Sequence, residues 1–211
     1  LMVAARSGAP DVVELLLTHG AEMEARGARG QTALMWAVAQ HHASVVTVLL
    51  ANGADVHARS DVWSQMMGVP PHGQPEYNRQ TTHGGNTALM FAARVGGVGS
   101  ARQLIAAGAN VDDTDARGVS ATTLAAHAGF GDLVELLLEN GAEPNAAEAG
   151  FGALHAAVMR RDRRMVGALL DHGADPNAVL LFGETVLMTA ARTGNPAVVE
   201  QLLAAGADVD A

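Results

Sequence analysis

The chain has 211 residues and a formal charge of −9; 49% of its residues are apolar, only 3% are aromatic, and none is cysteine. The absence of cysteine excludes a disulfide framework, a thiol nucleophile and a cysteine metal site, and it fits a reducing compartment such as the cytoplasm. The negative charge argues against general nucleic-acid binding, which requires a positive surface. No apolar run reaches the about 18 residues that a membrane-spanning helix needs.

One short phrase recurs from end to end of the chain. A glycine followed by alanine and an acid or amide returns at intervals of 33, 55, 33, 32 and 33 residues: Gly20, Gly53, Gly108, Gly141, Gly173 and Gly206. A period near 33 over six copies is typical of a stacked solenoid rather than of one closed globule. The interval of 55 is 33 plus 22, which predicts an insertion in one repeat.

Within one unit, the residue pattern predicts two short helices. Thr32 can cap the first helix with its hydroxyl, and Leu34 and Val38 then fall on one helical face. Gly53 can end the second helix in the left-handed conformation without a side-chain penalty. The apolar stripe of that second helix consists of Val45, Val46, Leu49 and Leu50. Such a pair cannot bury its apolar face alone, so its stability has to come from neighbouring repeats.

With this period, a Thr-x-Leu-x phrase, a small-residue pair and the Gly-Ala-Asp step, the chain resembles the ankyrin repeat over nearly its whole length. The resemblance implies an all-α solenoid of helix–loop–helix repeats with finger loops. We expect repeats at approximately 1–29, 30–60, 84–117, 118–149, 150–182 and 183–211, with residues 61–83 inserted in the finger loop after repeat two. The family's Thr-Pro-Leu-His phrase is mostly replaced here. His155 keeps the histidine, to which the resemblance assigns a structural hydrogen-bond network.

Both ends of the chain fall inside a repeat. Leu1 already stands at the anchor leucine, and Ala211 lies within the finger of the last repeat. We therefore expect a longer natural protein, for which export or a periplasmic location stays open beside the cytoplasm. The composition is rich in alanine and glycine and lacks lysine, which is typical of proteins from high-GC bacteria.

The insertion, residues 61–83, concentrates the unusual side chains of the chain. It holds Trp63, Met66, Met67 and Tyr77, and its prolines and glycines disfavour a helix. Aromatic and methionine side chains in a long loop are typical of a contact surface. Three readings stay open: docking onto the hydrophobic edge of the solenoid, which is favoured, contact with a partner, and disorder.

The insertion also contains residue types that bind metals or transfer protons. Asp61, His72, Glu76 and His83 are the candidates. None of them forms a pair at the spacing that makes a metal motif specific. We therefore expect solvated or capping roles for these four side chains, and no metal or other cofactor.

A second set of candidates occupies equivalent positions just after the small-residue pair of each repeat. We call this set the inner row: Arg6, Ala39, Arg94, His127, Met159 and Arg192. The resemblance implies that these positions line a concave face. Arg94 and Arg192 can bind carboxylates bidentately, and His127 can make such a contact sensitive to pH. A run of four arginines at 159–164 can bind an acidic segment or phosphate, but such a run is more often a solvated turn.

The sequence favours a non-enzymatic protein-interaction module that binds a protein partner as a monomer, with no nucleic acid and no membrane span. Partner contact is expected on the concave helix and finger face and on the insertion: Arg6, Arg94, His127, Met159, Arg192, Trp63 and Tyr77. No nucleophile elbow, phosphate loop or metal motif is present in the sequence. The alternative is a targeting or regulatory segment of a larger enzyme whose catalytic domain lies outside this chain.

Overall fold

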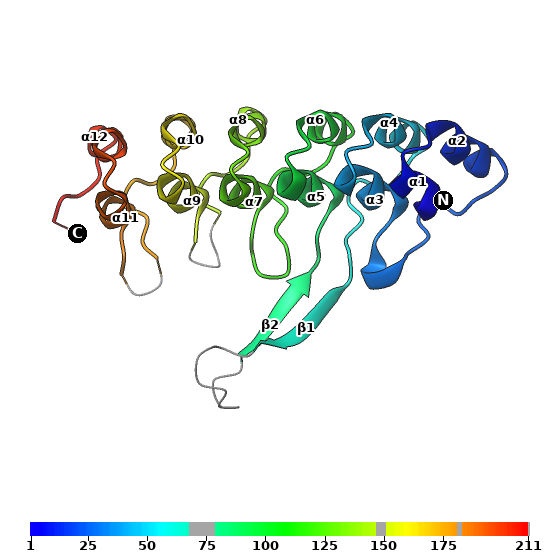
Figure 1. The fold of residues 1–211 in the computed structure, drawn as a ribbon, viewed down its shortest axis with the longest axis horizontal. Coiled ribbons are helices and arrows are strands. Elements are labelled where there is room, and N and C mark those ends of the chain that lie inside the picture. The colour runs from blue at the N-terminus through cyan, green and yellow to red at the C-terminus, as the bar shows by residue number, and fades with distance from the viewer. Residues whose placement is uncertain (68–78, 147–150, 181–182, 211) are drawn as a thin grey trace.

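The protein is an all-α repeat solenoid with one β-hairpin, as a computed structural model shows for residues 1–67, 79–146, 151–180 and 183–210. Helices of the described residues alternate between two parallel layers (Figure 1). The layer next to the fingers contains α1 (Met2–Ser7), α3 (Ala33–Ala39), α5 (Ala88–Val95), α7 (Ala121–Ala128), α9 (Ala153–Met159) and α11 (Val186–Thr193). The outer layer contains α2 (Pro10–Thr18), α4 (Ala43–Ala51), α6 (Val98–Ala106), α8 (Gly131–Glu139), α10 (Arg163–Asp171) and α12 (Pro196–Ala204).

Three helices of the finger-side layer, α3, α7 and α11, begin at hydroxyl caps. The Thr32 side chain accepts a hydrogen bond from the backbone of Met35 (3.4 Å), as the pattern predicts, and Ser120 and Thr185 cap α7 and α11 in the same way. Left-handed glycines close several of the turns to the outer layer. His41 and Arg161 hold equivalent positions at φ 60° and 59°, a conformation that side chains disfavour.

Small side chains fill the space between neighbouring repeats. Ala37, Ala92, Ala125 and Ala157 are each fully buried, which lets successive finger-side helices approach closely. Each of these helices packs against the equivalent helix of the next repeat, so the core is continuous along the stack. Trp36, whose position favours packing between repeats, is only half-buried in this layer.

A line of hydrogen bonds, which we call the finger ladder, ties successive fingers together. The acid or amide side chain four residues after the glycine of one Gly-Ala-Asp-type phrase is the acceptor. The donor is the backbone N–H of the third residue of that phrase in the next repeat. The bonded pairs are Glu24 with Asp55 (2.9 Å), Asp112 with Glu143 (2.7 Å), Asn145 with Asp175 (2.8 Å) and Asn177 with Asp208 (2.7 Å). The ladder holds the fingers in register because each bond needs the neighbouring repeat in place.

The finger ladder lacks one rung, at the junction between repeats two and three. His57 stands at the accepting position there, and no bond joins it to Asn110 among the described residues. Arg59 connects this junction instead. Its guanidinium donates to the backbone carbonyls of Gly85 (3.0 Å) and Thr114 (2.7 Å) and to the carboxylate of Asp113 (2.6 Å).

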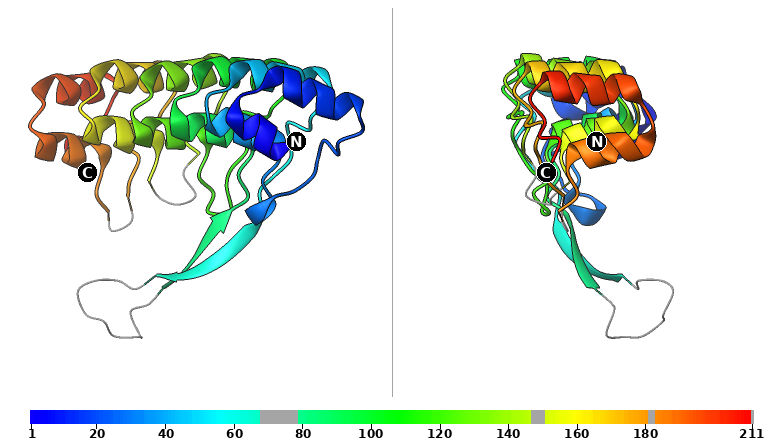
Figure 2. Two further views of the ribbon diagram at one scale, coloured as in Figure 1. Left: turned by 45° about the vertical axis from the view of Figure 1, so that its right-hand side comes forward. Right: turned by 90° about the vertical axis from the view of Figure 1, so that its left-hand side faces the viewer.

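The same junction carries the insertion, whose two arms form an antiparallel hairpin. Strands β1 (Val62–Met67) and β2 (Arg79–Gly84) pair in a register that sets Trp63 opposite His83. The hairpin projects from the fingers away from both helical layers (Figures 1 and 2), so its described part does not cover the helices as the favoured docking reading expected. Tyr77, together with His72 and Glu76, lies outside the described residues.

Backbone hydrogen bonds join the base of the hairpin to the fingers on both sides. Asp61 donates its N–H to the carbonyl of Arg29 in the preceding finger (2.8 Å), and Ala116 of the following finger donates to the carbonyl of Gly84 (3.0 Å). Ser60 links the two arms through its backbone and its hydroxyl. The hairpin base is therefore part of the finger array, because its backbone groups are satisfied by both neighbours.

We predict that His57→Asn completes the finger ladder. An asparagine oxygen can accept from the N–H of Asn110 as Asn145 does from Asp175. The substitution should raise the free energy of unfolding by about 0.5–1.5 kcal/mol, the net worth of one hydrogen bond. Urea denaturation measures this difference, provided that the slope of the unfolding free energy against urea concentration is unchanged.

The matched control is the reverse substitution, Asn145→His, at an intact rung. It removes the bond to Asp175 and a second bond from the amide of Asn145 to the carbonyl of Gly173 (2.9 Å), so stability should fall. An unchanged or lowered stability for His57→Asn, with Asn145→His clearly destabilised, would show that the missing rung costs nothing.

Candidate functional site

The structure brings the inner row together along one side of the stack. Each member lies in the last two residues of a finger-side helix. Arg6, Arg94, His127, Met159 and Arg192 are exposed, and Ala39 is half-buried. The helix periodicity alone produces this alignment, because equivalent positions of stacked repeats face the same way.

The two arginines for which we expected bidentate carboxylate binding already contact polar groups of their own repeats. Arg94 Nη2 donates to the side-chain oxygen of Asn86 (2.9 Å), and Arg192 Nη2 donates to the carboxylate of Glu184 (2.6 Å). Asn86 and Glu184 hold the same position, directly before the capping threonine. Each arginine is thus fixed in direction while part of its guanidinium faces solvent.

Two other members of the inner row contact aromatic rings, and a third exposes an apolar side chain. The guanidinium of Arg6 lies over the Trp36 ring, 5.0 Å from its centroid. His127 meets the Phe151 ring edge-on at 6.1 Å between centroids. Met159 leaves 51% of its surface exposed. The row therefore offers a mixture of cationic, planar and apolar groups, the residue types that are enriched in protein interfaces.

Trp63 of the hairpin lies at a polar cavity of about 330 Å³ between the hairpin base and the neighbouring fingers, which we call the stem pocket. Its lining comprises Arg29, Gln31, Ser60, Trp63, His83, Gly84, Asn86, Phe91, Arg94, Asp115 and Arg117. Three arginines against one aspartate give these residues a formal charge of +2, with histidine neutral. The pocket is thus a positive site in a chain whose net charge is −9.

One side of the stem pocket holds three planar groups, of which the Trp63 ring lies next to the other two. The Arg29 guanidinium carbon lies 4.5 Å from the centre of the Trp63 ring, and His83 stacks on that ring at 5.7 Å with an interplanar angle of 24°. Arg29 adopts φ 61°, a left-handed conformation that a side chain disfavours. His83 Nε2 is buried without a hydrogen-bond partner among the described residues.

Asp115 organises the other side of the stem pocket. Its buried carboxylate accepts from the backbone N–H groups of Arg117 (2.8 Å) and Val119 (3.1 Å), and from the Arg117 guanidinium (3.0 Å). Arg94 Nη2 lies 3.7 Å from the same carboxylate. Burial lowers the pKa of Arg94, Asp115 raises that pKa, and the positive charge of Arg117 lowers it. Two guanidiniums thus share one carboxylate.

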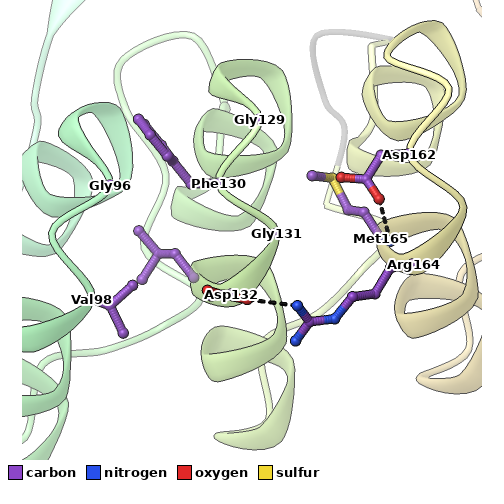
Figure 3. A pocket seen from close by; sticks show the side chains of 10 residues that line it. Gly96, Val98, Gly129, Phe130, Gly131, Asp132, Asp162, Arg164 and Met165 are labelled. Carbon is purple, nitrogen blue, oxygen red and sulfur yellow. Dashed lines mark hydrogen bonds and ion pairs between the residues drawn. The ribbon is translucent and has the colours of Figure 1, made fainter.

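A second cavity, of about 360 Å³, lies at the turns between helices in repeats three to five (Figure 3). The backbones of Gly96, Gly129 and Gly131 form much of its lining. Two aspartates and one arginine give its lining a formal charge of −1, and Arg164 donates to Asp132 (2.8 Å), as the figure shows. This cavity therefore has less unmet charge than the stem pocket.

The arginine-rich run at 159–164 is attached to repeat four. Arg164 also donates to Glu135 (2.6 Å), and this hydrogen bond, with the charge of Glu135, raises the pKa of Arg164. Arg160 donates to the carbonyl of His127 (3.0 Å) at the end of α7. Asp162 caps α10 by accepting from the backbone of Met165 (3.0 Å). The hydrogen bonds of Arg160 and Arg164 thus join repeat five to repeat four.

Sequence reasoning missed Arg29, Asp115 and Arg117 as members of a site. A signal for the two arginines was present: the triplet Ala-Arg-Gly at 28–30 recurs at 116–118, in the fingers on either side of the insertion. The described residues contain no cluster of three or more metal-ligating side chains placed to hold an ion. None of their helices has the length and apolar character needed to cross a bilayer.

His155 occupies the interior next to α11. Its ring is 1% exposed, and its Nε2 has no hydrogen-bond partner among the described residues. Burial lowers the pKa of His155, while a backbone hydrogen bond and the charge at Glu184 raise it by less. The ring is therefore held in its neutral form inside the stack.

A family model described as ankyrin repeats (3 copies) matches the chain at three stretches, residues 1–60, 69–148 and 146–211. A stretch of 94 residues is 44% identical to an ankyrin repeat-containing protein of Treponema pallidum (strain Nichols), covering 44% of this chain and 32% of that protein. The mitochondrial disaggregase of Homo sapiens is 30% identical over 195 residues, which are 89% of this chain and 24% of that protein. The chain thus spans about a third or less of the length of these relatives.

Solved structures share the fold over almost the whole chain. An ankyrin repeat domain from Acinetobacter baumannii AYE superposes with a TM-score of 0.82 at 25% identity, covering 98% of this chain and 97% of that one. The ankyrin repeat domain of Bcl-3, a member of the IκB protein family, gives a TM-score of 0.75 at 28% identity, covering 98% and 86% of the two chains.

We predict that acid destabilises the protein partly through His155. Its pKa is lower in the folded state than in the unfolded chain, where it is about 6.5. Below that pH the unfolded state binds more protons, so this contribution to stability is complete above about pH 6.5 and is lost as the pH falls. The melting temperature should drop between pH 7.5 and 5, and less steeply in His155→Asn.

The control for the His155 prediction is His57→Gln, at an exposed histidine. Its melting temperature is measured over the same pH range as those of the wild type and of His155→Asn. A His155→Asn slope that equals the wild-type slope would assign the acid sensitivity to other groups.

Proposed function

Because this chain belongs to the ankyrin repeat family, whose repeats generally serve as protein–protein interaction modules, we propose that it binds a protein partner on the surface formed by the inner row and the stem pocket. The binding is non-enzymatic in this proposal. Arg6, His127, Met159 and Arg192 supply contacts along the stack, and Trp63 supplies them at the hairpin. Tyr77 belongs to the same proposal, from the part of the insertion outside the described residues.

The observation that carries the proposal is the shared position of Arg94. This residue is a member of the inner row, and it also lines the stem pocket. The row and the pocket are therefore one continuous surface rather than two separate sites. An extended or convex partner that contacts several repeats of the row can reach the hairpin base as well.

The chemistry of this surface also favours a protein partner. Met159 is an exposed, adaptable apolar contact. The Arg6 pair with Trp36 and the His127 pair with Phe151 present rings and cations that are held in place by their neighbours. Side chains that are already held in place lose little conformational entropy on binding. A few such contacts can therefore supply most of the affinity.

A second candidate function is that the repeats recruit partners for an enzyme of which they form one segment. The match to the mitochondrial disaggregase of Homo sapiens, of which this chain spans 24%, favours this candidate. The binding surface would be the same in both cases. The candidates differ in what the rest of a longer protein does, and the activity of the full-length protein distinguishes them.

We predict that peptides selected from a random display library against this chain bind on the inner row. Met159→Asp places a charge on an apolar position of the proposed contact, so it should weaken the selected peptides at least about tenfold, as the loss of a strong contact does. Fluorescence anisotropy of labelled peptides measures the dissociation constants of wild type and variant.

The matched control is Leu15→Asp on α2 of the outer layer. Leu15 is 59% exposed and Met159 is 51% exposed, so both substitutions add one charge at a similarly accessible apolar position. The control should change affinity by less than about twofold, within the small effect of a non-contact surface change. Peptides that tolerate Met159→Asp, or a library that yields no binding peptide, would reject the inner row as the binding surface.

A further inference from the structure

We propose that the stem pocket binds the carboxylate of an aspartate or glutamate in an acidic segment of the partner protein. This inference rests on the proposed function, since it names the chemistry that the partner supplies at one end of the binding surface. It is carried by the charge, the geometry and the rigidity of the pocket.

The positive charge of the stem pocket is not balanced by its own residues. Its one lining carboxylate, Asp115, already accepts from two backbone N–H groups and from Arg117. The nearby Asp61 is paired with Arg26 at 3.2 Å, outside the lining. Arg29 has no ion pair among the described residues, and Arg94 is 3.7 Å from a carboxylate that it shares. A second carboxylate would lower the formal charge of the lining from +2 to +1.

The orientation of the guanidiniums suits an incoming carboxylate. The Arg29 guanidinium carbon lies over the Trp63 ring, and the guanidinium donates no hydrogen bond among the described residues, so its N–H groups are available. Those N–H groups lie in one plane and form the fork that matches the two oxygens of a carboxylate. The buried Nε2 of His83, which has no hydrogen-bond partner within the described part of the chain, adds a further polar group beside the same ring.

The size of the stem pocket favours a side chain over a larger body. Its volume of about 330 Å³ stands at the lower end of the range for binding pockets. Such a space admits one carboxylate side chain with part of its backbone. A longer segment then continues over the inner row, with which the pocket is contiguous through Arg94.

The stem pocket is built before a ligand arrives. The hairpin base is hydrogen-bonded to the fingers on both sides, and Asp115 fixes the loop that carries Arg117. The left-handed backbone of Arg29 is a strained conformation that its surroundings maintain, and such conformations gather at binding sites. Binding therefore costs little reordering, and that favours affinity from a small contact.

The experiment uses Trp63 as its own reporter. Trp36→Phe leaves Trp63 as the single tryptophan, because the chain contains two. An acetylated and amidated peptide of six glutamates is titrated into this variant, with the corresponding glutamine peptide as the neutral probe. We expect a saturable change of Trp63 emission with the glutamate peptide and none with the glutamine peptide. The affinity should fall as sodium chloride increases, since the contact is ionic.

Two substitutions with equal change of charge locate the binding. Arg29→Gln removes the stacked guanidinium of the pocket, and Arg102→Gln removes an exposed arginine on α6. We expect Arg29→Gln to weaken the glutamate peptide at least about tenfold, the scale of a lost charge-assisted pair. Arg102→Gln should stay within twofold. Arg117→Gln serves as a second pocket variant and should also weaken the peptide.

Several results would overturn the carboxylate proposal. They are the absence of a saturable response, an equal response to the glutamine peptide, and an equal effect of Arg102→Gln. Free glutarate or inorganic phosphate binding as tightly as the peptide would make the pocket a small-anion site instead. The net charge of −9 repels the peptide as a whole, so saturable binding requires a local positive site.

The outcome for the pocket is separable from the outcome for the proposed function. A silent Trp63 together with library peptides that depend on Met159 would remove only the pocket from the binding surface. A response of Trp63 to glutamate, with library peptides indifferent to Met159, would leave the pocket and reject the inner row.

Discussion

No helix pair of this chain can bury its own apolar face, so every other feature depends on the stacking of one repeat on the next. The stack requires small residues between finger-side helices, and alanines occupy those positions fully buried. It also brings a side-chain oxygen of one finger to a backbone N–H of the next, and these hydrogen bonds form the finger ladder. Side chains at one position of each repeat consequently form the inner row. The surface proposed for binding is thus a product of the same geometry that supplies the stability.

The insertion lies at the junction of repeats two and three, where the fingers are joined by different hydrogen bonds from those at the other junctions. Among the described residues, the junction of repeats two and three lacks the ladder bond that joins the fingers at the other junctions. Arg59 spans this junction with three hydrogen bonds instead. The hairpin leaves the finger array at this point and remains bonded to the fingers on both sides. Trp63 is thereby placed next to both Arg29 and His83, and the arginines of two flanking fingers meet around one hairpin base.

Local patterns in the sequence predict much of the fold, and contacts between distant residues explain what they miss. The period of 33 and the Gly-Ala-Asp step predict the repeats, and Thr32 and Gly53 act at the helix ends as expected. The hairpin is not predictable in the same way, because its register depends on pairing between residues twenty positions apart, such as Trp63 and His83. Arg29 and Arg117 are 88 residues apart and share a pocket only because two fingers flank the same hairpin.

The most direct measurement of this account is amide hydrogen exchange at the hairpin base. The N–H of Asp61 and the N–H of Ala116 bond to neighbouring fingers rather than within one repeat. If the hairpin base is an integral part of the finger array, both amides should exchange many times more slowly than in an unfolded peptide and should open only with the adjoining repeats. Exchange at the rate of an unfolded chain, beside protected helices α3 and α5, would contradict a prebuilt pocket.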